Sequence, residues 1–190
     1  MGLIAVGMGP SDQQTLRTLE PEVIRTLRKT AIQIQKGQGK TESLLWFGDD
    51  SDVWMKTLSH NLDKMASITN CKPIEVVGTN WKTRSKNTSA AAKKPTGGWA
   101  KYTNMSGAQS RNFRIRLDIA WNAKPLYRPG NTPGLSKFHT IVHEPTHLVL
   151  NTDDVSPAYG EINCKNKATN NPNNAKRNAD NWAFFVDDFR

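Results

Sequence analysis

The sequence predicts an α+β fold that is mainly helical and contains a small antiparallel sheet. Two long stretches in the first half carry apolar residues three or four positions apart, which is the spacing of one face of a helix. A stretch in the middle alternates apolar and charged residues, as a strand does when one side of its sheet covers the core. With 190 residues, of which 36% are hydrophobic, the chain is expected to form one domain over residues 1–190.

The apolar stripes place the first two helices. The first is predicted from Pro21 to Lys36, because proline is favourable in a first helical turn and the stripe follows it. Residues 1–20 precede this stripe and are predicted to form a loose segment. The second helix is predicted to start after Ser51, whose side chain can cap it, and to run to about Ser67.

The middle of the chain is predicted to supply the sheet. Short strands are expected from Ile74 to Val77, from Trp99 to Thr103 and from Phe113 to Ile119. Residues 79–98 are polar and basic, so they are predicted to form a mobile loop. An edge strand of such a sheet can hold an extended peptide by backbone pairing, although a purely structural sheet fits the pattern equally well.

The second half contains the motif H-E-x-x-H, formed by His143, Glu144 and His147. Residues four apart stand on one face of a helix, so the two imidazoles can bind a single zinc ion. Glu144 lies one position on, where it can hold and deprotonate a metal-bound water molecule. The apolar neighbours give this helix a face to bury, and Ser136 is a suitable cap for its start.

A catalytic zinc site normally has three protein ligands and one open position, so a third ligand is needed. The metzincin continuation is excluded because Leu150 and Asp153 occupy the positions of its glycine and third histidine. Glu161 is the only glutamate after the motif, and it lies in a stretch rich in glycine and asparagine. An aspartate from the pair Asp153 and Asp154 remains, because the chain can turn back to the metal there.

At this point the sequence resembles the aspzincins, the group of deuterolysin and peptidyl-Lys metalloendopeptidase. The resemblance rests on H-E-x-x-H followed by T-x-D and Y-G, on W-F-G at residues 46–48, and on N-A-D-N-W-A-F-F at residues 178–185. It extends from about Thr26 to the end of the chain. It implies a zincin-like fold, in which the sheet lies beside the H-E-x-x-H helix, and one bound Zn²⁺.

The resemblance also implies the roles of individual residues. The implied zinc ligands are His143, His147 and Asp154, with Glu144 as the general base and Tyr159 as a hydrogen-bond donor to the transition state. The chain departs from the family pattern in having four residues rather than two between the ligand aspartate and the tyrosine. It also has Pro145 inside the motif helix, where proline removes a backbone donor and tends to kink the helix.

Two further polar residues accompany the motif. The resemblance implies that Asp180 binds substrate, because the corresponding aspartate of the lysine-specific enzymes receives the side chain that follows the cleaved bond. The alternative is structural, since an aspartate near a helix start often caps free N–H groups. His139 lies four residues before His143 on the same helical face, where a surface or packing role is favoured over a role behind the metal ligands or at the rim of the site.

The function predicted from these features is zinc-dependent hydrolysis of peptide bonds in a protein or peptide substrate. A zinc amidase that acts on cell-wall peptide would use the same ligands, and a basic binding module with a degenerate zinc site is the non-catalytic alternative. The net charge of +9 is spread along the chain without a nucleic-acid-binding motif, so a solvated basic surface is favoured.

Between residues 163 and 178 the chain is rich in asparagine and lysine and is predicted to be a loop before a terminal helix from about Ala179.

The biological setting is predicted from what the sequence lacks. No apolar run reaches the length of about 20 residues that a transmembrane helix needs, and the N-terminus has no convincing signal peptide. Cys71 and Cys164 are too few for a disulfide scaffold, and the sequence does not decide whether they pair. We expect secretion by a route without a signal peptide, as for a bacterial effector or toxin of the type VI kind, with an immunity or inhibitor protein as partner.

Overall fold

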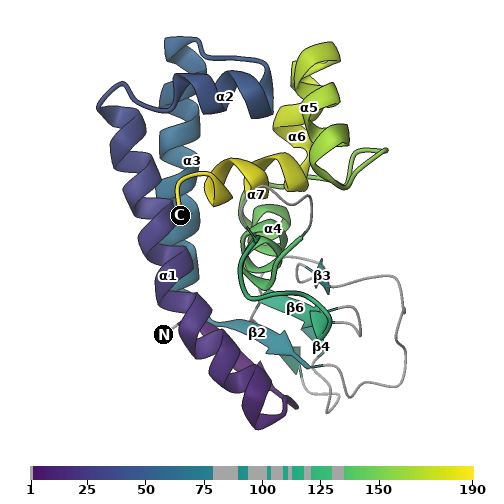
Figure 1. Cartoon of the computed structure of the whole chain (residues 1–190). Coiled ribbons are helices and arrows are strands. Elements are labelled where there is room, and N and C mark those ends of the chain that lie inside the picture. Colours follow the sequence, from purple (N-terminus) through teal and green to yellow (C-terminus); the bar gives the residue numbers. More distant parts are fainter. Residues whose placement is uncertain are drawn as a thin grey trace.

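The computed structural model describes residues 2–78, 90–93, 102–103, 109–110, 113–117, 121–129 and 135–190. Helices dominate these residues (Figure 1). The helices are α1 (Pro10–Gln35), α2 (Lys40–Phe47), α3 (Asp52–Cys71), α4 (Lys137–Val149), α5 (Glu161–Asn170), α6 (Pro172–Arg177) and α7 (Ala179–Asp187). The strands are β1 (Leu3–Val6), β2 (Ile74–Val77), β3 (Ala90–Lys93), β4 (Tyr102–Thr103), β5 (Gln109–Ser110) and β6 (Phe113–Leu117).

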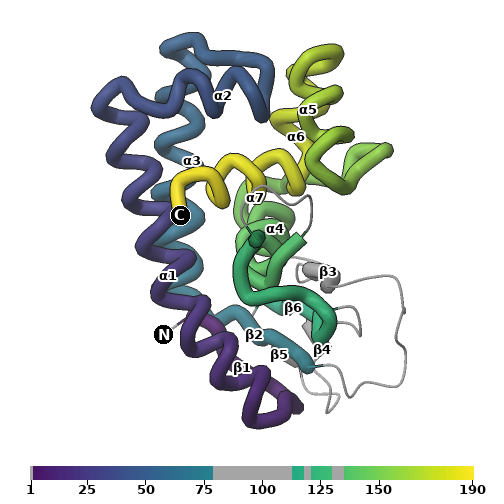
Figure 2. The backbone as a smooth tube through the Cα atoms, viewed as in Figure 1, coloured from purple at the N-terminus to yellow at the C-terminus, as the bar shows by residue number. Residues whose placement is uncertain are grey.

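Helices α1 and α3 lie side by side along one side of the molecule, and α4 and α7 pack against them (Figure 1). The predicted apolar stripes form this contact, since Val23 and Leu27 of α1 and Leu58 and Leu62 of α3 are fully buried. Ser51 caps α3 as predicted, because its side chain accepts a hydrogen bond from the Trp54 N–H at 3.3 Å. The C-terminus of the chain lies beside α1 (Figure 2).

The N-terminal segment 1–20 is ordered, so the prediction that it is loose was wrong. Strand β1 pairs with β2, and α1 starts at Pro10 and continues through Pro21. Leu16 and Leu19 are buried, which gives the early turns of α1 a place on the core. The side chain of Glu20 also accepts a hydrogen bond from the Gly2 N–H at 2.7 Å. These contacts outweigh the single backbone hydrogen bond that Pro21 removes.

The main sheet has the strand order β1-β2-β6-β3, and its first three strands are parallel. The predicted antiparallel sheet is therefore wrong for these strands, and only β3 runs antiparallel to β6. The alternation in Phe113–Leu117 does not mark a solvent-facing side, because Arg114 is buried against Glu75 of β2 at 2.6 Å. Strand β6 pairs on both sides and is no edge strand, while β3 forms the edge beside α4.

The other predictions for the middle of the chain fall largely outside the described residues. Of the loop predicted for 79–98, the structure describes only residues 90–93, which form β3. Of the strand predicted for residues 99–103, it describes Tyr102–Thr103, which pairs with β5.

The C-terminal third is more helical than predicted. Residues 163–178, which were predicted to be a loop, belong mainly to α5 and α6. Asn171 caps α6 by accepting a hydrogen bond from the Asn174 N–H at 3.1 Å, and Pro172 occupies a favourable first-turn position. Cys164 and Ala175 are fully buried, so tertiary packing stabilises helices whose sequence carries little apolar periodicity.

Helix α7 lies at the centre of the core. It begins at Ala179, as predicted. The ring of Phe184 stacks on Trp46 of α2, with ring centroids 4.9 Å apart. The side chain of Asn181 is fully buried and joins three helices: it donates to the carbonyl oxygens of Trp46 and Cys164 at 2.6 and 3.0 Å and accepts from Asn178 at 2.7 Å.

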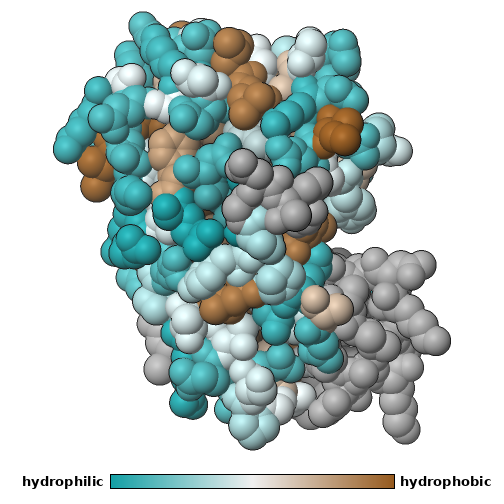
Figure 3. All heavy atoms as spheres, viewed as in Figure 1, coloured by the Kyte–Doolittle hydropathy of each residue, from teal (hydrophilic) through white to brown (hydrophobic). Residues whose placement is uncertain are grey.

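The surface that Figure 3 shows is mostly hydrophilic, with separate hydrophobic patches. Within the part of the chain that the structure describes, no helix combines the length and apolarity needed to cross a membrane.

We predict that Asn181→Ala lowers the free energy of unfolding by about 3 kcal/mol, because it leaves two buried carbonyl oxygens without their donor. Urea denaturation measures this loss. Asn173→Ala, at an exposed position of α6, is the matched control and is expected to change stability by less than about 0.5 kcal/mol. Equal stability of the two variants would contradict the role assigned to Asn181.

Candidate active site

Helix α4 carries the H-E-x-x-H motif and starts at the predicted cap. The Ser136 hydroxyl accepts a hydrogen bond from the His139 N–H at 3.0 Å. Because the helix starts there, Pro145 is interior, yet α4 continues to Val149. The hydroxyl of Thr146 donates to the carbonyl of His143 at 2.7 Å and strengthens the turn around the proline.

Three ligand atoms converge next to this helix. The Nε2 atoms of His143 and His147 are 3.1 Å apart, so the proline has not separated the two rings. Oδ1 of Asp154 lies 3.3 Å from Nε2 of His143 and 3.5 Å from Nε2 of His147. Ligand atoms about 2.05 Å from a tetrahedral zinc ion are about 3.4 Å from one another, so the three atoms fit this ion.

The second nitrogen of each imidazole is also held. Nδ1 of His143 is 3.0 Å from Oδ1 of Asp180, and Nδ1 of His147 is 2.8 Å from the backbone carbonyl of Thr152. Both partners are oxygens that accept, so each Nδ1 carries the hydrogen. In a neutral imidazole the lone pair is then on Nε2, and the two Nε2 atoms face the centre of the cluster.

The charges of the cluster support one another. Burial disfavours the charged form of His143, but its hydrogen bonds to Asp154 and Asp180 outweigh this and raise its pKa to about 10. Burial also acts against ionised Asp154 and Asp180, yet the histidines hold the pKa of each carboxyl well below its usual range. A metal cation bound here would therefore meet the ionised carboxylate of Asp154 and would displace protons from the imidazoles.

Glu144 and Tyr159 lie at the same cluster. Glu144 is 4% exposed, and its charge contributes to the raised pKa values of His143 and His147. The Tyr159 hydroxyl donates to Oδ2 of Asp154 at 2.7 Å, and its ring stacks on His143 at a centroid distance of 6.0 Å. Burial and the bond to Asp154 raise the pKa of Tyr159, so the phenol stays protonated and able to donate.

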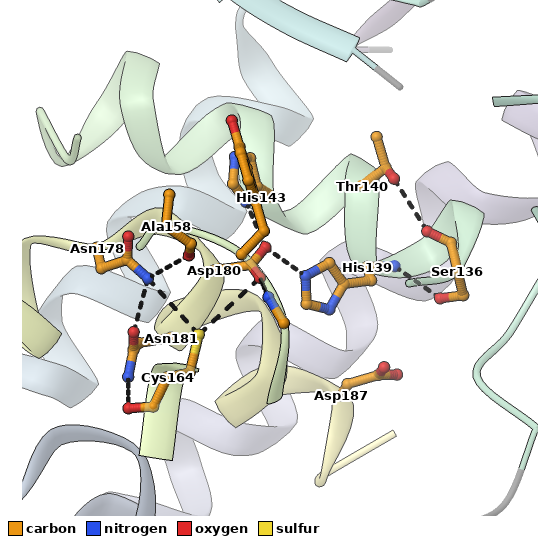
Figure 4. Close-up of polar contacts among 12 residues, drawn as sticks. Ser136, His139, Thr140, His143, Ala158, Cys164, Asn178, Asp180, Asn181 and Asp187 are labelled. Atoms are coloured by element: carbon orange, nitrogen blue, oxygen red, sulfur yellow. Dashed lines mark hydrogen bonds and ion pairs between the residues drawn. The ribbon is translucent and has the colours of Figure 1, made fainter. Parts of the chain in front are cut away.

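The segment from Asp154 to Gly160 reaches this position although it is longer than the family pattern. Asn178 holds it at two points: its side chain accepts from the Val155 N–H at 3.0 Å. It also donates to the Ala158 carbonyl at 3.0 Å (Figure 4). Lys167 donates to the carbonyl of Pro157 within the same segment. The extra residues are thus accommodated in an anchored loop.

Asp153 and Glu161 stand apart from the three ligand atoms. The Asp153 carboxylate is exposed and pairs with Arg177 at 2.6 Å. Glu161 pairs with Lys165 at 2.7 Å at the start of α5. Of the two aspartates that the sequence left open, the structure brings Asp154 to the histidines.

Asp180 lies beside the rings of His139 and His143, and its predicted contact with substrate stays a prediction. Its side chain is 1% exposed. Oδ1 contacts His139 and His143 at 2.9 and 3.0 Å, and Oδ2 accepts from the Gly160 N–H at 2.8 Å (Figure 4). Both oxygens are therefore engaged by the protein itself.

Sequence reasoning missed the supporting residues Thr152, Asn178 and the contact of His139 with Asp180. The four-residue step from His139 to His143 is a signal for the last of these, because it puts both rings on one face of α4. Thr152 and Asn178 act through the folded path of the chain, which no local pattern indicates.

Comparisons with known proteins bear on the family and the fold of this chain. The profile of the aspzincin family, described as lysine-specific metallo-endopeptidase, matches residues 33–187. The structure is similar to that of a zinc peptidase from Grifola frondosa, with a TM-score of 0.67 and 21% sequence identity, over 95% of this chain and 97% of that one. The comparison with curated proteins gave no match.

The structural likeness establishes the fold, and the family match covers most of the chain, including every residue of the cluster. It also decides between an enzyme and a non-catalytic binding module. The chain belongs to the aspzincin family and is a zinc metalloendopeptidase.

Proposed function

We propose that His143, His147 and Asp154 bind one zinc ion and that the site hydrolyses peptide bonds in protein or peptide substrates. The observation that carries the proposal is the triangle of ligand atoms, with sides of 3.1, 3.3 and 3.5 Å. Hydrogen bonds at both Nδ1 atoms support it, because they orient the imidazole lone pairs toward the ion.

Glu144 is proposed as the general base. Zinc, when bound, acts as a Lewis acid and lowers the pKa of a water molecule. Glu144 follows His143 directly and is buried at the cluster, which supports a role in which its carboxylate accepts the proton of the attacking water. It then returns this proton to the leaving amine.

Tyr159 is proposed to stabilise the oxyanion of the transition state. Its hydroxyl lies at the ligand Asp154, and about half of its side chain is exposed to an approaching substrate. A protonated phenol beside the developing negative charge donates a hydrogen bond to it.

The delivery as an effector and the immunity partner stay predictions from the sequence.

We predict that His143→Ala, His147→Ala and Asp154→Ala lose bound zinc and activity together, because each removes one of three ligands. Metal analysis of the purified variants and competition with a chelator measure the loss. Asp153→Ala is the matched control and is expected to remain zinc-replete, since its carboxylate pairs with Arg177. A zinc-replete Asp154→Ala beside a zinc-poor Asp153→Ala would assign the ligand to Asp153.

We predict that Glu144→Gln keeps its zinc and lowers kcat by about 10²–10⁴-fold, because the amide cannot accept the proton. Metal analysis and cleavage of a peptide library measure the two quantities on one sample. Glu42→Gln in α2 controls for the loss of a carboxylate elsewhere and should retain full activity. Full activity of Glu144→Gln would exclude its role as the base.

We predict that Asp180 does not give the enzyme a preference for lysine after the cleaved bond, because both oxygens of its carboxylate are engaged within the protein. Asp180→Asn should instead weaken zinc binding by about 10–100-fold, as expected for a partner of a metal-bound histidine. Cleavage-site sequencing on a peptide library and chelator competition test both statements. A lysine preference that disappears in Asp180→Asn at unchanged zinc affinity would instead support the substrate role.

A further inference from the structure

His139 is buried one turn before His143 and contacts the carboxylate to which the ring of His143 is hydrogen-bonded. Its side chain is 1% exposed, and its Nε2 lies 2.9 Å from Oδ1 of Asp180. This is the same oxygen that Nδ1 of His143 contacts at 3.0 Å. Figure 4 shows the Asp180 carboxylate between the two rings.

The carboxylate oxygen can only accept, so both histidines donate to it. Oδ1 then has two N–H donors and Oδ2 has the Gly160 N–H, which together fix the plane and the position of the carboxylate. Without His139, the only hydrogen-bond donor to Oδ1 among these contacts would be the ring of His143. Oδ1 would then have no second donor to fix its position while it holds that ring.

The ring of His139 is itself fixed by packing. It stands edge-on to Phe184 of α7 at a centroid distance of 4.4 Å, and its backbone N–H bonds to the Ser136 hydroxyl. Among the residues that the structure describes, none makes a hydrogen bond with its Nδ1. If His139 served packing alone, an apolar side chain would have a smaller free-energy cost of burial, because burying a polar ring is unfavourable unless its hydrogen bonds are made.

We propose that His139 is a positioning residue for the zinc site, which acts by holding Asp180 in the orientation that binds the Nδ1 hydrogen of His143. The inference rests on the proposed zinc site. It assigns His139 no contact with the substrate or with the metal ion.

A second reading of the same geometry is a second metal site, since one atom each of His139, His143 and Asp180 lie within 4.8 Å of one another. The short distances from one shared oxygen to two ring nitrogens, with His143 Nε2 facing the other cluster, favour the hydrogen-bonded arrangement. The zinc stoichiometry separates the two readings.

The test compares two kinds of substitution at His139. In His139→Gln the amide nitrogen can take the place of Nε2 and still donate to Asp180, whereas His139→Leu and His139→Phe have no donor. Thr140→Val is the matched control, because it removes a buried hydrogen bond of the same helical turn, from Thr140 to the Ser136 carbonyl at 3.0 Å, without touching Asp180. All variants are first checked for folding by circular dichroism.

Zinc affinity by chelator competition and the visible spectrum of the Co²⁺-substituted protein are the readouts. We expect His139→Leu or His139→Phe to weaken zinc binding by about tenfold and to shift the Co²⁺ bands. His139→Gln and Thr140→Val should stay within about threefold of the wild type. In an Asp180→Asn background, the loss on His139→Leu should disappear, because the residue through which His139 acts has been changed.

Unchanged zinc affinity in a folded His139→Leu or His139→Phe variant would overturn the proposal. So would a His139→Gln variant as weak as the apolar ones, since the hydrogen bond would then be irrelevant. Binding of two zinc ions per chain, with one lost on substitution of His139, would replace it by the second-site reading. A wild type that binds no zinc would instead refute the proposed function on which this inference rests.

Discussion

The arrangement of the site depends on a buried carboxylate, that of Asp180. An ionised carboxylate in a helix interface is strongly destabilising unless it is paired and hydrogen-bonded. Here the donors come from two places. They are the histidines of α4 and the Gly160 N–H at the end of the loop from Asp154 to Gly160. The carboxylate is therefore satisfied only when α4, α7 and this loop are all in place, which couples the placement of these histidines to folding.

Helix α7 serves the core and the site at once. The rings of Trp182, Phe184 and Phe185 are almost completely buried and pack against α2, while Asp180 in the first turn of the same helix contacts His143 of α4. Helices α1 and α3 form the support behind α4 and α7. Because Asp180 is attached to the most buried helix, its carboxylate has little freedom to move, and the imidazole that it contacts is held accordingly.

The sequence by itself determined the elements that have a strong local signal. The apolar stripes of α1 and α3, the cap at Ser51 and the start of α7 could be identified because helical spacing and capping are properties of neighbouring residues. The relation of His143, Glu144 and His147 was equally local, since residues four apart on a helix share a face whatever surrounds them. The interior Pro145 did not change this.

The tertiary structure decided what depends on distant partners. The direction of β2 and β6 follows from the long crossover connections, and strand patterns do not encode it. Segment 1–20 and helices α5 and α6 are stabilised by burial against the core, which their own composition does not reveal. Asp180 lies 37 residues after His143 and, without the fold, could be a cap, a substrate contact or a support. Its contacts were set only when α7 packed on α4, because a hydrogen bond between elements exists only after the chain has brought them together.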